Sequence, residues 1–182
     1  EKTYLKSTPF DLFKHRIPWL MLLMVSATFT GMIITSFEDA LSLLPVLTAF
    51  IPMLMDTGGN CGSQSSTLII RGLALDEIKF KDIFRVIFKE FRIALLVGIG
   101  LAIANGIRIF IMYKDLKMAI VIALSLSLIV IIAKIIGCTL PLFAKKLHMD
   151  PAIMASPLIT TVVDTCSIMI YFSIATRVFT LS

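Results

Sequence analysis

The stretch MAIVIALSLSLIVIIAKIIGCTLPLFA, residues 118–144, carries a single charged side chain, Lys134. An α-helix rises about 1.5 Å per residue, and the hydrocarbon core of a bilayer is about 30 Å thick. This stretch is therefore long and apolar enough to cross a membrane as one helix. The rest of the chain has the same character, since 58% of its 182 residues are hydrophobic and the mean hydropathy is +0.95. The composition predicts a membrane protein rather than a soluble domain.

Four further apolar runs lie on either side of this stretch. Read with a window of about 19 residues, they cover approximately 17–37, 41–70, 93–113 and 151–176. We predict an all-α membrane protein with five transmembrane helices per chain, which form one domain at 17–182. Residues 1–16 are polar and basic, and we interpret them as a cytoplasmic or interfacial lead-in, the stub of a linker helix.

The lysine and arginine residues set the expected orientation. They are concentrated in the lead-in, in the connection after the second run and just before the fifth run, whereas the opposite side carries few. The positive-inside rule then places the N-terminus in the cytoplasm and, with five spans, the C-terminus outside. The net charge of +5 comes from these membrane flanks, so it does not indicate nucleic-acid binding. The expected location is the cell membrane, with several passes through the lipid bilayer.

Asp164 lies inside the fifth run, where a carboxylate is costly. Counted from Pro151 at about 1.5 Å per residue, it lies about 20 Å into the helix, and its short side chain reaches neither surface. A charged group at a helix centre costs about 2.5–3.5 kcal/mol on insertion scales. Thr160 and Thr161 precede Asp164 by one turn on the same side of the helix. A water-filled ion pathway explains this polar stripe better than a protonated or hydrogen-bonded structural aspartate does.

Lys134 differs from Asp164 because its side chain is long. It lies about 24 Å along its helix from Met118, close enough to the inner membrane boundary for the side chain to reach the polar surface. We therefore expect Lys134 to be structural and to take no part in ion passage.

The polar stretch MDTGGNCGSQSST, residues 55–67, interrupts the second run. Pro52 and the pair Gly58 and Gly59 favour a helix break, and irregular backbone at membrane depth occurs only where protein buries it or it lines a cavity. Close helix packing is the alternative role for the glycines. Asp56 and Asn60 would lie about 22 and 28 Å along this span. Asp56 is thus a candidate acid at the inner mouth.

Two motifs, GGNCGSQSSTLIIRGLA at 58–74 and DPAIMASPLITTVVDTCSIMIYF at 150–172, resemble the membrane domain of the MgtE family of magnesium channels and transporters. The resemblance covers nearly the whole chain. It implies a homodimer whose second and fifth helices line a central pore, with Asp164 of both chains binding a largely hydrated Mg²⁺. Gly59 and Asn60 would shape the inner part of the pathway. The resemblance also implies cytosolic regulatory domains upstream of the first span, which are absent from this chain.

The chemistry of Mg²⁺ agrees with this resemblance. Mg²⁺ prefers oxygen ligands, releases its water reluctantly and is commonly held through one or two carboxylates. Asp164, doubled by a twofold axis, would supply the charge, and neutral side-chain oxygens would hold the hydration shell. The predicted pore-lining residues are Gly59, Asn60, Gln64, Ser156, Thr160 and Thr161. Mn²⁺ and Co²⁺ would suit the same site, and no organic cofactor is expected.

Three rival functions are weaker. A transporter of a small organic solute would respond to competition by a small molecule rather than discriminate among divalent ions. A non-transport membrane scaffold would not need an acid at mid-membrane. An intramembrane aspartyl protease would need Asp56 and Asp164 at one depth, sharing a proton, whereas their positions along the spans place them apart and the G-x-G-D signature is missing. We therefore expect no enzymatic activity.

Overall fold

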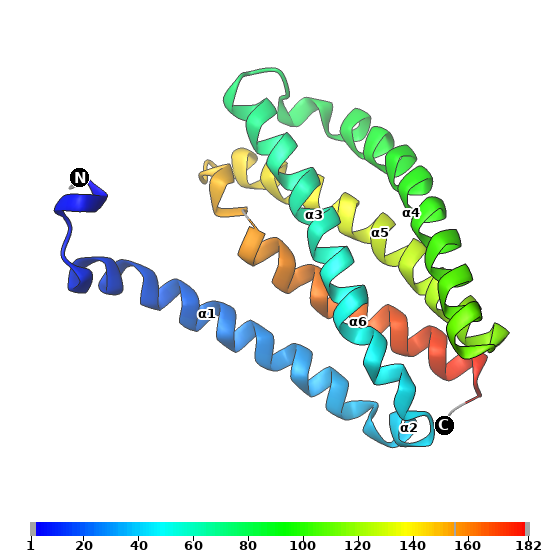
Figure 1. The fold of residues 1–182 in the computed structure, drawn as a ribbon. Helices are drawn as coiled ribbons and strands as arrows, with labels where there is room; N and C mark the ends of the chain where they lie inside the picture. The colour runs from blue at the N-terminus through cyan, green and yellow to red at the C-terminus, as the bar shows by residue number, and fades with distance from the viewer. Residues whose placement is uncertain (1–2, 155, 181–182) are drawn as a thin grey trace.

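The computed structural model describes residues 3–154 and 156–180, and within these ranges every regular element is a helix (Figure 1). This confirms the predicted all-α class. The long helices are α1 (Pro9–Ser36), α3 (Ile51–Ala74), α4 (Ile83–Tyr113), α5 (Leu116–Lys146) and α6 (Ser156–Val178). The short helices are η1 (Tyr4–Lys6), α2 (Glu38–Leu43), η2 (Pro45–Phe50), η3 (Phe80–Asp82) and η4 (Pro151–Met154).

Four of the described helices are long and apolar enough to cross a membrane. They are Pro9–Ser36, Phe80–Tyr113, Leu116–Lys146 and Pro157–Val178. Helix α3 is not among them, although its 24 residues would extend about 36 Å at 1.5 Å per residue. The polar stretch at 55–67 makes it less apolar than the others. The count of five spans therefore stays a prediction, with α3 as the additional one.

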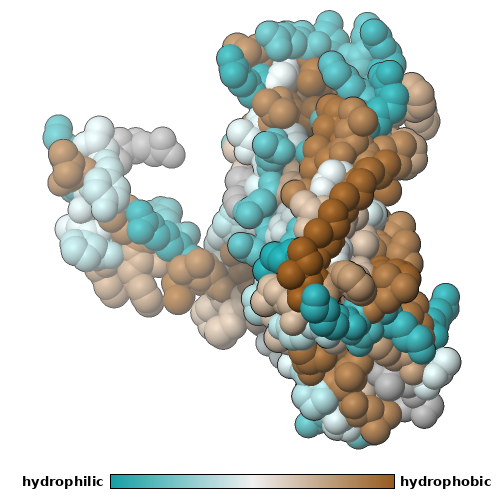
Figure 2. All heavy atoms as spheres, turned by 45° about the vertical axis from the view of Figure 1, so that its right-hand side comes forward, coloured by the Kyte–Doolittle hydropathy of each residue, from teal (hydrophilic) through white to brown (hydrophobic). Residues whose placement is uncertain are grey.

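Helices α3, α4, α5 and α6 form the body of the molecule. Helix α5 packs against the other three, and α3 also packs against α6. Helix α1 contacts α6 and diverges from the body toward its own N-terminus (Figure 1). Hydrophilic residues gather at the upper end in Figure 2, at the level where Figure 1 places the connection between α3 and α4.

Helix ends follow local capping signals. The Thr8 side chain accepts a hydrogen bond from the backbone N–H of Asp11, and the Asp11 carboxylate accepts one from the backbone of Thr8, which is a capping box. Helix α1 therefore begins at Pro9, well before the apolar run that starts near residue 17. Asp115 caps α5 by accepting a hydrogen bond from the N–H of Met118 (3.2 Å).

The predicted break at the glycine pair of the second span is wrong. Helix α3 runs without interruption through Gly58 and Gly59, and the irregular part of the chain comes earlier, at α2 and η2. A Cβ added to Gly58 would lie 2.8 Å from Cγ2 of Ile129 in α5, and one on Gly62 would lie 2.8 Å from Cγ2 of Ile159 in α6. Close packing, the alternative role, is therefore the role of Gly58 and Gly62.

The fifth run also begins later than predicted. Asp150 accepts a hydrogen bond from the N–H of Ala152 (3.0 Å), but the turn that it caps is the short helix η4. Helix α6 starts only at Ser156. Asp164 therefore lies about 12 Å from the start of its α-helix, rather than about 20 Å.

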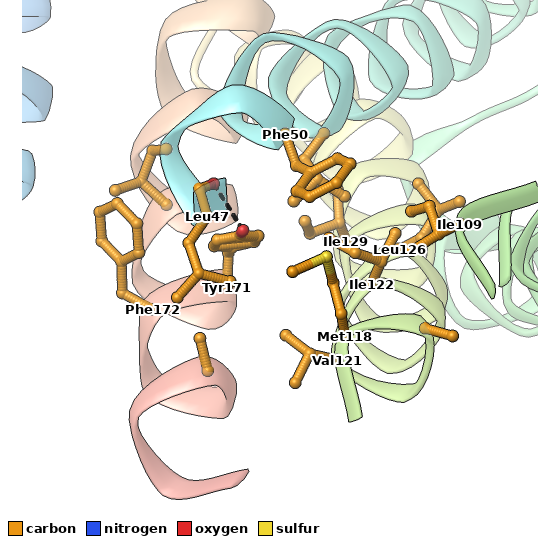
Figure 3. Close-up of a cluster of buried hydrophobic side chains, with 14 of the residues drawn as sticks. Leu47, Phe50, Ile109, Met118, Val121, Ile122, Leu126, Ile129, Tyr171 and Phe172 are labelled. Carbon is orange, nitrogen blue, oxygen red and sulfur yellow. Dashed lines mark hydrogen bonds between the residues drawn. The ribbon is translucent and has the colours of Figure 1, made fainter. Parts of the chain in front are cut away.

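A cluster of large apolar side chains fixes the chain segment that leads into α3 (Figure 3). Leu47 and Phe50 of η2 pack there against α5 and α6 and are almost fully buried. The buried hydroxyl of Tyr171 donates a hydrogen bond of 2.6 Å to the carbonyl oxygen of Leu47. This bond joins α6 to the backbone of η2, directly before α3 begins. The start of α3 is thereby held against α6, on which the candidate site depends.

Candidate functional site

An open pocket of about 500 Å³ lies where the polar faces of α3 and α6 meet. The residues that line it are Ile51, Pro52, Met55, Asp56, Gly59, Asn60, Ser63, Thr160 and Asp164. Five of the eight site residues predicted from the sequence are among them, so the structure brings together Asp56, Gly59, Asn60, Thr160 and Asp164.

Helical spacing explains why these residues share one pocket. Residues 52, 56, 59 and 63 recur every three or four positions and thus lie on one face of α3, with residue 60 beside 59. Thr160 and Asp164 are four positions apart on α6. Thr160 packs closely on Gly59, because a Cβ at Gly59 would lie 3.2 Å from the Thr160 methyl group. The absence of a side chain at Gly59 lets the two polar faces approach each other.

Asp56 and Asp164 both line this pocket, although the sequence placed them at different depths. That predicted separation is wrong, because α3 begins at Ile51 and α6 at Ser156. Asp56 is exposed in the single chain, whereas Asp164 is partly buried. The buried oxygen Oδ1 of Asp164 has no hydrogen-bond partner among the described residues. Two carboxylates in one pocket create a negative region that suits a cation or its water.

Thr161 does not line the pocket in the described part of the chain. The Thr161 hydroxyl donates to the carbonyl oxygen of Pro157 (2.9 Å), one turn back in α6, and Thr161 is not a lining residue. The side chain of Ser156 lies outside the described part of the chain. Their predicted roles in contacting the ion stay predictions.

Gln64 lies one turn beyond Asn60 on α3, but its side-chain oxygen is directed elsewhere. Lys134 Nζ in α5 donates a hydrogen bond of 3.4 Å to Gln64 Oε1. Lys134 is only 3% exposed, so the prediction that it extends to the inner membrane boundary is wrong. The sequence did not reveal this contact, because the direction of a side chain around a helix depends on which helix packs there.

Glu90 is a buried acid that the sequence analysis did not single out. It is 7% exposed, and its Oε2 accepts a hydrogen bond of 2.7 Å from the hydroxyl of Ser65. One signal was available: Glu90 falls between Ile83 and Ala94 on the stripe of α4 that is buried. An acid on an apolar helical stripe requires a partner, and here the partner is in α3.

The sequence profile of the MgtE family, described as a divalent cation transporter, matches residues 51–174. The chain belongs to the MgtE family. A protein of Bacillus subtilis named magnesium transporter MgtE is 42% identical over 162 residues, which cover 89% of this chain and 36% of that protein. A Thermus thermophilus protein of the same name is 36% identical over 172 residues, which cover 94% of this chain and 38% of that protein. The chain thus spans somewhat more than a third of the length of these relatives.

Membership of the MgtE family confirms the resemblance that the two motifs indicated. Together with the long apolar helices, it makes this chain a multi-pass protein of the cell membrane. It also confirms that the chain is not an enzyme, since the family consists of membrane cation transporters. The aspartyl-protease alternative is thereby excluded, even though Asp56 and Asp164 share a pocket.

Proposed function

We propose that this chain is the pore domain of a magnesium transporter that works as a homodimer. The observation that carries the proposal is the pocket between α3 and α6, where two carboxylates and the amide of Asn60 lie together in a member of a divalent cation transporter family. The name of the relatives favours Mg²⁺ as the transported ion. Mn²⁺ and Co²⁺, which accept similar oxygen ligands, would also pass.

Asp164 holds the ion in this proposal through water rather than by direct coordination. Mg²⁺ exchanges its water reluctantly, so a hydrated ion directs water hydrogens outward toward acceptor oxygens. The buried oxygen of Asp164 has no other partner among the described residues and is a suitable acceptor. Asn60 and Asp56 supply further acceptors from α3. Gly59, with its missing side chain, lets Thr160 and the polar face of α6 approach α3 closely.

The exposed polar face of α3 supports the dimer. Asp56, Asn60 and Gln64 are exposed in the single chain, and such a face is not tolerated against lipid. A second copy related by a twofold axis would cover it and bring two Asp164 carboxylates to one ion. Helices α3 and α6 of each chain would then line the pore, and α3 would be the fifth membrane-spanning helix.

Mg²⁺ flux into liposomes, followed with an enclosed fluorescent indicator, tests the proposal. Asp164→Asn keeps the shape of the side chain and removes one negative charge per chain. We expect it to lose most Mg²⁺ flux and its discrimination against Na⁺ while it still folds. Asp76→Asn is the matched control, because Asp76 lies in the α3–α4 connection and has a positive φ that asparagine tolerates. It should transport normally.

Two outcomes would contradict the proposal. If Asp164→Asn transports Mg²⁺ with normal affinity and selectivity, Asp164 is a structural residue. If flux is blocked by a small organic molecule and shows no preference among divalent ions, the chain transports an organic solute instead.

A further inference from the structure

Lys134 and Glu90 are buried charges of opposite sign that the proposed pathway does not use. They reach α3 from different helices and contact neighbouring residues of it. Glu90 of α4 accepts a hydrogen bond from Ser65 (2.7 Å), and Lys134 of α5 donates one to Gln64 (3.4 Å). Buried charges inside a membrane protein are expensive and mark functional positions more often than exposed ones do. Of the two α3 residues contacted, Ser65 is buried and Gln64 is exposed.

The contact from Lys134 determines which atoms of Gln64 are free. A carboxamide has one acceptor oxygen and one donor nitrogen on the same carbon atom, and an ammonium group has donors only. The ammonium group of Lys134 therefore selects the oxygen of Gln64 and directs it toward α5. Gln64 itself is exposed and lies one turn beyond Asn60, and its NH₂ group is the part of the carboxamide that Lys134 does not engage.

An NH₂ group facing the pathway affects a hydrated cation differently from an oxygen. The outer surface of hydrated Mg²⁺ consists of water hydrogens, which require acceptors. Asp164 and Asn60 offer acceptors, whereas Gln64 in this orientation offers donors. Gln64 in this orientation is therefore a poor acceptor for the hydrated ion, whereas the sequence predicted that its oxygen would hold the hydration shell. The pathway thus has a position that binds the hydrated ion weakly next to one that binds it strongly. Rapid ion release requires such weak binding.

We infer that Lys134 is a positioning residue for ion passage: it turns the Gln64 oxygen away from the pathway and so keeps hydrated Mg²⁺ from being held beyond Asn60. The inference rests on the proposed function, because it assumes that α3 lines the pathway. It assigns to Lys134 a role opposite to the purely structural one that its sequence position suggested.

Substitution of Lys134 provides the main test, with the Mg²⁺ concentration dependence of flux as the measurement. Lys134→Met should free the Gln64 oxygen to turn into the pathway. The KM for Mg²⁺ should then fall by about two- to tenfold, the effect of one additional net hydrogen bond, and maximal flux should fall as well. Lys134→Arg keeps charge and donors and should restore the original KM.

Loss of the positive charge could also lower KM through space, and Gln64→Met distinguishes the two causes. In the Gln64→Met background, positioning predicts no further change in KM from Lys134→Met, because the oxygen is gone. A charge effect predicts the same fall in both backgrounds, which would overturn the inference. Lys134→Gln, neutral but still a donor, should keep a nearly normal KM.

If the Lys134 variants do not fold, Gln64→Met alone still tests the inference. Its KM should change by less than about twofold, since the oxygen that it removes does not face the ion; the effect of one lost net hydrogen bond would be larger. A large rise in KM would show that Gln64 holds the ion directly and would overturn the inference. If flux through the unsubstituted chain does not depend on Mg²⁺ concentration, the proposed function is overturned as well. If only the inference fails, the unsubstituted chain still shows normal Mg²⁺-dependent flux.

Discussion

Asp56 and Asp164 line the same pocket in different surroundings, so we expect them to contribute unequally to Mg²⁺ binding. Asp164 is partly buried with an oxygen that has no partner among the described residues, and Asp56 is exposed to solvent in the single chain. A carboxylate in a low-dielectric site acts more strongly on an ion than one that water screens. Asp164 would therefore be the main acceptor, and Asp56 would raise the local cation concentration.

Asp56→Asn tests this division of roles. We expect KM for Mg²⁺ to rise by about two- to fivefold, consistent with loss of a screened charge interaction, while maximal flux stays within about a factor of two. The measurement is liposome flux at several Mg²⁺ concentrations and two ionic strengths, because salt should reduce the difference. Loss of flux as complete as in Asp164→Asn would show that the two acids form one inseparable site.

Individual residues differ in how well the sequence revealed their positions. That Asp164 and Thr160 lie together could be predicted, because their spacing of one helical turn requires no knowledge of other helices. Gln64 could not, because its oxygen is oriented by Lys134, seventy positions later in the chain. The buried position of Lys134 likewise depends on the packing of α5 against α3, which periodicity within one helix does not determine.

Helices α3 and α5 approach each other closely at Gly62 and Gly137. A Cβ on Gly137 would collide with the backbone oxygen of Gly62, and backbone cannot move aside as a flexible side chain can. The polar face of α3 continues on the other side of the same helix. The position of the pocket therefore depends on a contact that only glycine permits.

Gly137→Ala should consequently affect both stability and transport. Overpacking of this kind costs about 1–3 kcal/mol, and displacement of α3 should lower Mg²⁺ flux several-fold. Thermal unfolding in detergent and liposome flux are the two measurements. Gly100→Ala is the matched control, since a Cβ at Gly100 in α4 has no atom within 4 Å. Equal effects of the two substitutions would argue against this role for the α3–α5 contact.

The elements were predicted better in kind than in their bounds. The apolar runs gave the long helices because a length of about 20 apolar residues has few other structures available to it in a membrane. The glycine pair was misread because glycine favours both helix breaks and close packing, and only the neighbouring helices α5 and α6 decide between them. The start of α6 was misplaced because Asp150 caps a short turn rather than the helix itself.

At the scale of the whole molecule, the two ends of α5 provide a test of orientation. Lys117 and Lys146 are both exposed and lie near opposite ends of this helix. In a chain without its natural cysteines, Lys146→Cys should react with a membrane-impermeant reagent from the cytoplasmic side and Lys117→Cys from outside.

Measurement of the mass of the same samples in mild detergent should give the mass of a dimer of two chains. Labelling of both positions from one side, or an active monomer, would contradict the five-span dimer.

The divergence of α1 from the body has a mechanical consequence. The hydroxyls of Thr30 in α1 and Thr165 in α6 lie 3.0 Å apart in a hydrogen bond, and Thr165 is the neighbour of Asp164. Helix α1 is about 40 Å long, whereas Thr30 is only about 9 Å from its end at Ser36. If α1 rotates as a rigid body about that end, the displacement of Thr30 is about one fifth of the displacement of Pro9. A sideways shift of about 5 Å at Pro9 would then arrive beside Asp164 as about 1 Å, a displacement large enough to lengthen a water-mediated contact beyond hydrogen-bond range.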